Sequence, residues 1–361
     1  MADQFSEEDI DIEEEVEEDA ISISYDIATY PSDFTLSGIA KMWEDKDITI
    51  PDFQREFVWT IRQSSLLIDS FLTGLPVPPV FFYIDDDNIN LVIDGQQRIL
   101  SVVFFFEGYF GKESTQGKRL VFRLTGLGNE SPYYNKRYED LEEVDQRKLK
   151  QAVLRAVNIR QLSPADEGTS AFHIFERLNT GGTPLRPQEI RNVVFRGKFN
   201  QLLKEANKDS SWRKIIGKPY LDKRQKDIEF LLRVFSLVGA SENYEKPMKE
   251  FLNIAMKRHS NGKSKKVASF FDAFPRMTET VLAELGSKPF HLRGPLNLSA
   301  LDSVFSVIIA NHEKINKQTL KERYIALKAD HEFNAHTSYN TTDSNTVQAR
   351  IKVVNKYLLD N

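Results

Sequence analysis

The sequence has 361 residues, which at roughly 150 residues per domain is enough for two domains with separate cores. With 40% hydrophobic and 28% charged residues it has the composition of an ordinary globular protein, and this excludes a collagen-like or broadly disordered chain. Cysteine is absent, which excludes disulfides, thiolate nucleophiles, iron–sulfur clusters and cysteine-ligated zinc and favours a reducing, cytoplasmic compartment. There is no apolar run of membrane-spanning length and no secretory signal, so we expect no membrane association.

The net charge of −5 conceals a segregation of charge along the chain. Residues 1–19 contain eleven acidic residues and no basic one, whereas residues 191–361 contain 30 basic and 18 acidic residues. Such a dense run of like charge repels itself and cannot bury apolar surface, so we predict a disordered acidic tail over residues 1–19. The tail is either simply solvated or occupies a basic groove when no polyanion is bound.

After the tail, residues 20–182 predict an α/β (α+β) domain, because short β-branched and aromatic runs alternate with apolar residues at helical spacing. The four-residue polar segment 85–88 predicts a hairpin between its two flanking strands. Helices are predicted over 35–45, 62–73, 97–109 and 164–178, and strands over 48–51, 80–84, 90–93, 120–124 and 152–160.

From Pro187, which is a favoured residue in the first turn of a helix, the pattern is helical with short breaks. Residues 183–361 therefore predict an all-helical, basic domain. The predicted helices are 187–206, 222–238, 247–259, 267–286, 299–312, 319–328 and 344–359.

The segment VIDGQQR, residues 92–98, is the one most suggestive of chemistry, because it ends a predicted strand and opens a helix. Helix N-termini present unpaired backbone N–H groups; Gly95 lets an anion approach the backbone, and Arg98 can bind it bidentately. Asp94 could hold a divalent metal or orient a water, and Gln96 or Gln97 could position that water for attack on a phosphoryl group. In the alternative, structural interpretation, Asp94 caps the helix and pairs with Arg98.

Two further segments could contribute to the same site. In IPDFQREFVW, residues 50–59, Arg55 lies among aromatic residues and could make a second phosphate contact, or it could form a surface ion pair with Glu56. In FERLNTGGTPL, residues 175–185, a helix end precedes a glycine-rich loop. There the Asn179 amide and the Thr180 hydroxyl could contact a base or a ribose.

These segments, together with LIDSFLTGLPVPPVFFY, occur in an order that resembles the N-terminal domain of GmrSD-type modification-dependent restriction proteins, over roughly residues 35–200. The resemblance implies a ParB/sulfiredoxin-like fold, nucleoside triphosphate hydrolysis and defence against phage DNA. Carried over to this sequence, it implicates Asp94 through Arg98, with Gln54 and Arg55 as pocket partners. Members of that family often continue into a His-Asn-His nuclease domain, which we do not find here, and neither is there a complete P-loop.

The basic region contains one dense cluster, at residues 257–266. Such a cluster suits salt-sensitive, sequence-blind contact with a phosphate backbone, or it is a solvated loop between helices. Its members are Lys257, Arg258, Lys263, Lys265 and Lys266.

Two functions remain open from the sequence. The first is a nucleotide-binding, NTP-hydrolysing DNA sensor of a restriction or anti-phage system, which would use Mg²⁺, with Asp94 as its contact, because triphosphate charge must be neutralised. The second is a non-catalytic DNA-binding module that partners a separate nuclease subunit. The identity of the nucleotide and the formation of a homo-oligomer are left open by the sequence.

Overall fold

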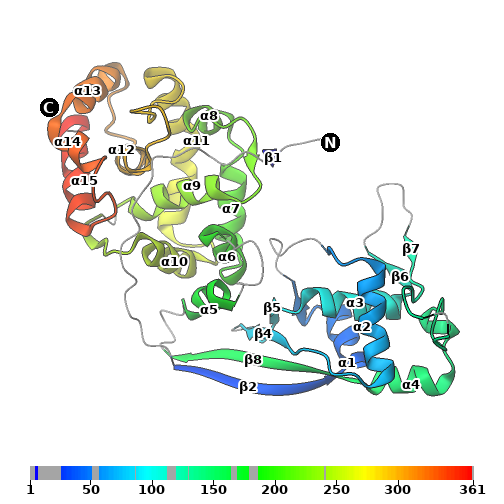
Figure 1. Cartoon of the computed structure of the whole chain (residues 1–361). Helices are drawn as coiled ribbons and strands as arrows, with labels where there is room; N and C mark the ends of the chain where they lie inside the picture. Colours follow the sequence, from blue (N-terminus) through cyan, green and yellow to red (C-terminus); the bar gives the residue numbers. More distant parts are fainter. Residues whose placement is uncertain are drawn as a thin grey trace. The chain divides into compact units, whose positions relative to one another are not determined.

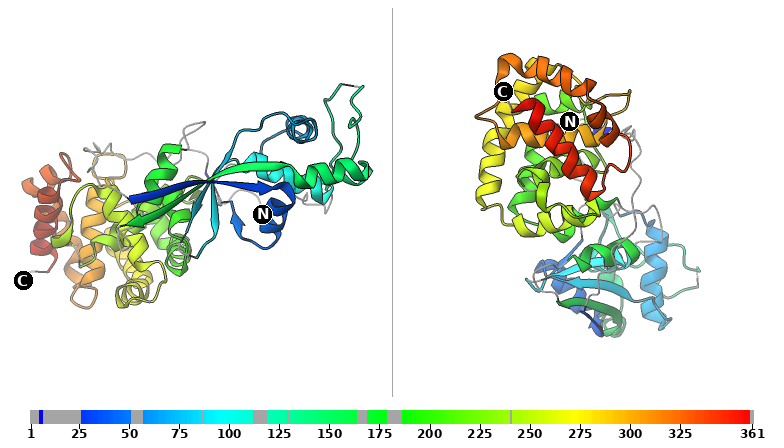
Figure 2. Two further views of the ribbon diagram at one scale, coloured as in Figure 1. Left: turned by 90° about the horizontal axis from the view of Figure 1, so that it is seen from below. Right: turned by 90° about the vertical axis from the view of Figure 1, so that its left-hand side faces the viewer.

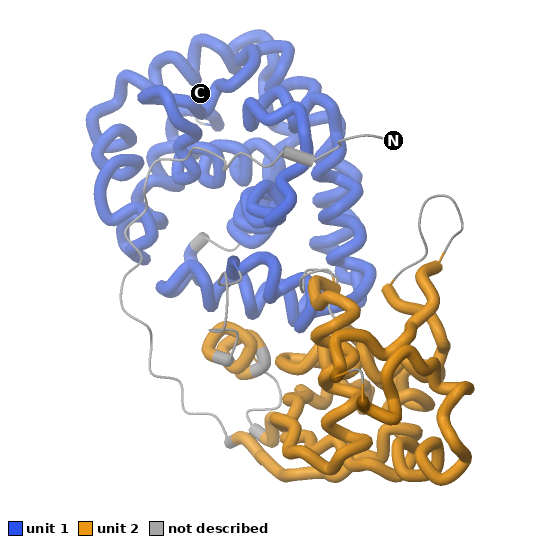
Figure 3. Tube along the Cα trace, turned by 45° about the vertical axis from the view of Figure 1, so that its right-hand side comes forward, with its two compact units in different colours: residues 1–24, 185–361 blue, residues 25–184 orange. Residues whose placement is uncertain are grey.

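The computed structural model describes residues 5–6, 26–50, 57–85, 87–111, 119–128, 130–163, 169–178, 186–239 and 241–359 (Figure 1). Figure 2 shows the same ribbon from two other sides. The chain divides into two compact units, which are coloured separately in Figure 3. One comprises residues 25–184, and the other comprises residues 185–361 together with the first 24 residues. We call them the α/β unit and the helical unit. Each has its own hydrophobic core.

The α/β unit is built on a five-stranded mixed sheet in the order β2-β8-β4-β5-β3. The outer strand β2 runs antiparallel to β8, and β4 lies parallel to β8 and antiparallel to β5, as the predicted hairpin requires. The short edge strand β3 lies parallel to β5. The bounds are β2 (Asp26–Thr35), β3 (Ile48–Thr49), β4 (Val80–Ile84), β5 (Asn90–Asp94) and β8 (Val153–Ser163).

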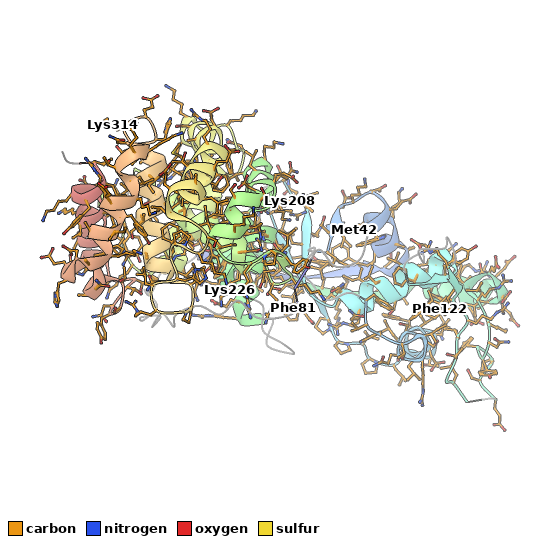
Figure 4. All side chains as sticks on the ribbon, turned by 90° about the horizontal axis from the view of Figure 1, so that it is seen from above. Met42, Phe81, Phe122, Lys208, Lys226 and Lys314 are labelled. Atoms are coloured by element: carbon orange, nitrogen blue, oxygen red, sulfur yellow. The ribbon has the colours of Figure 1, made fainter. Side chains whose placement is uncertain are left out.

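Helices complete this unit, and α3 is its most buried helix, with Ile99 through Phe105 all buried. Both α1 and α2 pack against α3. Phe105 of α3 packs edge-to-face on Phe122, which is fully buried; Phe122 is labelled in Figure 4. The elements are α1 (Leu36–Glu44), α2 (Ile61–Thr73), α3 (Gln96–Glu107), α4 (Glu143–Gln151), α5 (Ser170–Leu178), the 3-10 turn Tyr138–Asp140 and the small hairpin of β6 (Tyr109–Phe110) and β7 (Leu120–Val121).

Local sequence explains where α2 begins and ends. Thr60 and Gln63 form a capping box, in which the threonine side chain accepts from the Gln63 amide and the glutamine side chain accepts from the Thr60 amide. The helix ends at Gly74, whose φ of 80° is in the left-handed region that glycine adopts without strain. Ser64 and Ser65 are buried on α2; Ser64 accepts from the Ser101 hydroxyl on α3, and Ser65 accepts from the backbone amide of Thr125 in the loop after β7.

The helical unit packs its helices around a large apolar core in which Trp212 stacks on Phe305. Its short strand β1 (Phe5–Ser6) pairs in parallel with β9 (Leu221–Asp222). The helices are α6 (Pro187–Val194), α7 (Lys198–Ala206), α8 (Ser210–Ile215), α9 (Lys226–Leu237), α10 (Met248–His259), α11 (Lys265–Leu285), α12 (Leu298–Ala310), α13 (Lys317–Ala329), α14 (His331–His336), α15 (Ser344–Leu358) and the 3-10 turn Ser241–Asn243.

The predicted fold class, an α/β unit followed by helices, is confirmed. The ParB/sulfiredoxin-like assignment and the domain limits 1–19, 20–182 and 183–361 stay predictions from the sequence. Within the described residues, none of the helices combines the length and apolar character that crossing a membrane requires.

Some predicted elements were wrong in detail. The predicted helix 187–206 is two helices, because Gly197 has a φ of 148° and a Cβ there would meet the Ser260 carbonyl oxygen at 2.3 Å. Strand β2 and helices α4, α8 and α14 were missed. The predicted disordered tail stays a prediction, because it lies outside the described residues except for Phe5 and Ser6, which form strand β1.

Candidate functional site

The segment at residues 94–98 folds as the sequence predicts, into a strand–turn–helix junction. Strand β5 ends at Asp94, and α3 begins at Gln96. Gly95 is the N-cap residue and has a φ of 102°. A Cβ on Gly95 would stand 2.3 Å from Cγ1 of Val80 on the neighbouring strand, so only glycine fits both the backbone conformation and the space. We call residues 94–98 the DGQQR turn.

Arg98 is held firmly within this turn. Its Nη2 donates to Oδ2 of Asp94 at 2.6 Å and to the carbonyl oxygen of Pro79 at 3.0 Å. The Arg98 side chain is only 17% exposed, whereas Asp94 is 55% exposed. The Arg98–Asp94 ion pair that the structural interpretation predicts is therefore present. The buried Nε of Arg98 is left without an acceptor among the described residues.

The structural interpretation also predicts that Asp94 caps α3, and the structure does not show this cap. The N-cap position belongs to Gly95, which has no side chain that could accept from the first turn. The first turn of α3 contains no acidic residue either. Asp94 itself therefore does not act as the capping carboxylate at this end of α3.

Gln97 connects the DGQQR turn to the second sequence motif. Its Oε1 accepts hydrogen bonds from the backbone amides of Val58, at 3.0 Å, and Trp59, at 3.1 Å. The sequence predicts that Gln97 could position a water, and in the structure its side-chain oxygen accepts from two backbone donors. Gln96, the neighbouring candidate, is half-buried at the first position of α3.

Buried serines behind the turn fix α3 against α2, and the sequence analysis did not identify them. Ser101 on α3 is hydrogen-bonded to Ser64 on α2 at 2.8 Å, and its hydroxyl also bonds the Gln97 carbonyl oxygen at 2.7 Å. Both serines are fully buried. A serine at a core position of a helical pattern was the only available signal, and it is a weak one.

The remaining parts of the second and third motifs are described only in part. Gln54 and Arg55 lie outside the described residues, and so do Asn179 and Thr180. In the described end of the second motif, the ring of Phe57 packs edge-to-face on Phe104 and Phe110, at centroid distances of 5.0 and 5.4 Å.

The third motif begins on α5, which packs against β5, the strand that leads into the DGQQR turn. Phe172 and Phe175 of α5 are fully buried. The structure therefore brings the described ends of both motifs to strand β5 and helix α3.

The basic cluster, residues 257–266, lies at the end of α10, the turn that follows and the start of α11 in the helical unit. Arg258, Lys263 and Lys265 are exposed, and Lys257 is half-buried. Lys266 differs from them, because its ammonium donates to the Ser236 carbonyl oxygen at 3.0 Å and lies 4.9 Å from the centre of the Phe235 ring. Burial and the nearby Arg258 lower the pKa of Lys266 to about 8.

Other residues of this turn also face inward. His259 packs its ring against Phe199 and Phe235, and Ser264 bonds its Nδ1 at 2.8 Å. Burial and the neighbouring Lys266 and Arg258 lower the pKa of His259 to about 4. The basic cluster therefore exposes Arg258, Lys263 and Lys265 to solvent, whereas Lys266 packs within the helical unit.

Metal binding was predicted at Asp94. Within the described ranges, no group of three or more His, Asp or Glu side chains comes together as a metal site. Mg²⁺ commonly takes only one or two protein carboxylates and completes its shell with water and substrate phosphate. A single exposed carboxylate such as Asp94 fits a metal that arrives with a nucleotide, and it does not fit a cage made by the protein alone.

The fold defines a two-unit protein with a mixed α/β unit, which contains the DGQQR turn, and a helical unit, which contains the basic cluster. Residues 39–196 match the family model described as the GmrSD restriction endonuclease, N-terminal domain. This part of the chain is therefore consistent with a GmrSD-type N-terminal domain, and the match suggests a component of a restriction or anti-phage system. No nuclease domain was identified beside it, and no curated protein matches the chain significantly.

Proposed function

We propose that the chain is the nucleotide-binding, NTP-hydrolysing and DNA-sensing component of such a system, and that the DGQQR turn binds the triphosphate. The observation that carries this proposal is the turn itself: a left-handed glycine at the start of α3 beside an arginine that Asp94 and the Pro79 carbonyl hold in place. A helix N-terminus attracts phosphate through its free N–H groups and partial positive charge. An arginine already held in place loses little conformational freedom on binding.

In this proposal each polar residue of the turn has a separate role. Arg98 turns part of its guanidinium from Asp94 to a phosphate oxygen, and the Pro79 carbonyl keeps the side chain in position. Gln97 fixes the segment that follows Gln54 and Arg55, which are offered as further pocket residues. Gln96, Asn179 and Thr180 remain candidates for contacts with the attacking water or the nucleoside.

Asp94 would then become free to contact Mg²⁺ brought by the nucleotide. The metal would supply neutralisation of phosphate charge during transfer. One half-exposed carboxylate oxygen next to a bound phosphate is consistent with how this ion is usually held.

DNA sensing is proposed for the exposed part of the basic cluster. Arg258, Lys263 and Lys265 stand in solvent within eight residues of sequence, with Lys257 beside them. Contacts of this kind attract any phosphate backbone and weaken as salt rises. Lys266 is left out of this surface because its ammonium is bonded within the helical unit.

The test is phosphate release from GTP, ATP and CTP with Mg²⁺, with and without DNA, in the wild type, Arg98→Ala and Arg147→Ala. Arg147 is an exposed arginine that pairs with Glu143 on α4, and it serves as the matched control. We expect turnover in the wild type and the control and a loss of at least tenfold in Arg98→Ala. Melting curves of all three proteins would check that they are folded.

One observation favours the second function, a binding module without turnover that partners a separate nuclease. The Arg98–Asp94 pair and the Gln97 contacts already use polar groups that hydrolysis would need. If no nucleotide is turned over and Arg98→Ala weakens DNA binding instead, this second function replaces the first.

A further inference from the structure

The pairing of strands β1 and β9 attaches the acidic N-terminal part of the chain to one place on the helical unit. The two strands run parallel over both residues of β1. Because they are parallel, the chain leaves both strands in the same direction. Glu7 and Glu8 follow β1, and Lys223 and Arg224 follow β9. The first acids of the N-terminal segment are therefore directed toward two cations of the helical unit.

Strand β9 is well supported, because a buried arginine fixes the segment that contains it. Arg213 donates from Nε to the Lys218 carbonyl oxygen at 2.7 Å and from Nη2 to the Tyr220 carbonyl oxygen. Its Nη1 donates to Oδ2 of the buried Asp227 at 2.7 Å, and the same oxygen accepts from the backbone amide of Asp222 at 3.0 Å. The charge of Arg213 is thus compensated inside the unit, and the positive charge at the surface comes from other residues.

The surface around β9 is rich in cations, and we call it the β9 face. Residues 214–226 contain five basic residues and one acid, and that acid, Asp222, is buried. Lys288, from the loop after α11, joins them, because its backbone amide donates to the Lys214 carbonyl oxygen at 3.2 Å. Arg224 pairs with Glu189 at 3.2 Å. The β9 face comprises Lys214, Lys218, Lys223, Arg224 and Lys288.

Three lysines of the β9 face contribute charge that no acid neutralises. They are Lys214, Lys218 and Lys288, which we call the face lysines, and none of them forms an ion pair within the described residues. Lys214 and Lys288 are exposed, and Lys218 is half-buried. Burial, followed by the charges of Lys288 and Lys218, lowers the pKa of His291, so both ammonium groups act on the same ring. Such a group of cations attracts an anion that carries several charges.

The β9 face is separate from the basic cluster at residues 257–266. Helix α11 begins at Lys265 in the cluster and ends at Leu285, three residues before Lys288. Its 21 residues span about 30 Å, at about 1.5 Å per residue. The two groups of cations therefore lie at opposite ends of this helix.

We propose that the β9 face binds polyanions, and that the acidic segment 7–19 of the same chain occupies it until a polyanion displaces the segment. Residues 7–19 contain ten acidic residues and no basic one, and the chain enters this segment at β9. Tethering raises the local concentration of the segment, so ion pairs that are weak singly become effective together. Only the identification of the polyanion as DNA rests on the proposed function.

Docking of the segment is tested first by cross-linking in the full chain, which has no natural cysteine. Glu7→Cys and Lys223→Cys place one thiol just after β1 and the other just after β9, and a short bis-maleimide reagent joins thiols that lie close together. Glu7→Cys with Lys321→Cys, an exposed position on α13, is the control pair. We expect the first pair to be cross-linked at low salt and the control pair not to be.

The dependence of this cross-link on charge separates docking of the acidic segment from strand pairing alone. High salt, inorganic polyphosphate, or alanine at all three face lysines should each lower the yield about threefold, because exposed ion pairs are screened by salt and individually weak. Alanine at Arg258, Lys263 and Lys265 of the basic cluster should leave the yield unchanged.

Competition is tested by binding of inorganic polyphosphate and of a short DNA duplex. The variant with Glu7→Gln, Glu8→Gln and Asp9→Asn should bind polyphosphate about three- to tenfold more tightly than the wild type at low salt, and alanine at the face lysines should abolish this gain. The matched control neutralises three exposed acids elsewhere in the helical unit and should bind as the wild type does. Its substitutions are Glu279→Gln, Glu322→Gln and Glu332→Gln.

Three results would overturn the proposal. The first is an equal cross-linking yield from both cysteine pairs. The second is a yield that changes neither with salt, nor with polyphosphate, nor with the face lysines, which would leave only the strand pairing. The third is equal affinity of the wild type and the neutralised variant for polyphosphate. A gain in polyphosphate binding without any binding of DNA supports occupation of the face by the segment and counts against the proposed DNA sensing, so the two failures are distinguishable.

Discussion

The DGQQR turn and the basic cluster use positive charge in different ways. At the turn, one guanidinium is restrained by Asp94 and the Pro79 carbonyl, beside a glycine that no other residue could replace. At the cluster, several cations follow one another, and the structure places them in different environments, with Lys265 exposed and Lys266 over the Phe235 ring. A restrained cation suits recognition of one anion in one geometry, and exposed cations suit a polyanion of any sequence.

Gly95→Ala should have the largest effect, because it combines a φ of 102° with a clash on Val80. We expect it to lower the free energy of unfolding of the α/β unit by about 3 kcal/mol, measured by urea denaturation. Gly74→Ala is the matched control: its φ is 80°, nothing lies within 4 Å of its added Cβ, and a cost of about 1 kcal/mol is expected. Equal costs would mean that the turn is not tightly packed.

Replacing Arg258, Lys263 and Lys265 together by alanine should weaken DNA binding. Each lost phosphate contact lowers the slope of log affinity against log salt by about one, so the slope should fall by about three. Lys266→Met should leave the slope unchanged, since its ammonium is already bonded to Ser236. Affinity measured at several salt concentrations decides between these outcomes, and a triple variant that binds like the wild type removes the cluster from the DNA surface.

Gln97→Leu should loosen the link between the DGQQR turn and the second motif. Two backbone amides lose their acceptor, and we expect a cost of about 1–2 kcal/mol in the free energy of unfolding. Gln97→Glu keeps an acceptor oxygen and should be closer to the wild type. Urea denaturation followed by tryptophan fluorescence measures both, and a leucine variant as stable as the glutamate variant would contradict the anchoring role.

Lys266 predicts a smaller, pH-dependent effect. Its native pKa of about 8 is below its ordinary value of 10.5, so between these pH values the unfolded chain binds more protons than the native one. This group therefore adds stability as the pH rises from 8 toward 10.5, and the contribution is lost as the pH falls back through that window. The melting temperature of Lys266→Met should lack this rise, and Lys265→Met should retain it; identical profiles for the two variants would place Lys266 in solvent.

Local patterns in the sequence predicted the hairpin of β4 and β5, the glycine turn and the start of α3, because each is determined by adjacent residues. Strand β2 was missed since it contains Pro31 and pairs only with the distant β8; as an outer strand it tolerates the missing donor.

The partners of the candidate residues were equally hard to foresee. Gln97 bonds amides 38 and 39 residues away, and Lys266 bonds a carbonyl 30 residues away. Such contacts depend on how elements pack, and neither spacing nor charge in the sequence encodes them.

The most direct test of the central claim is calorimetric binding of Mg²⁺ complexes of GTP, ATP and CTP to the wild type, Arg98→Ala and Arg147→Ala. If the DGQQR turn binds the triphosphate, at least one nucleotide binds the wild type and Arg147→Ala alike, and Arg98→Ala binds it at least tenfold more weakly. Equal affinity in all three proteins, with all three folded, would contradict the assignment of the nucleotide to this turn.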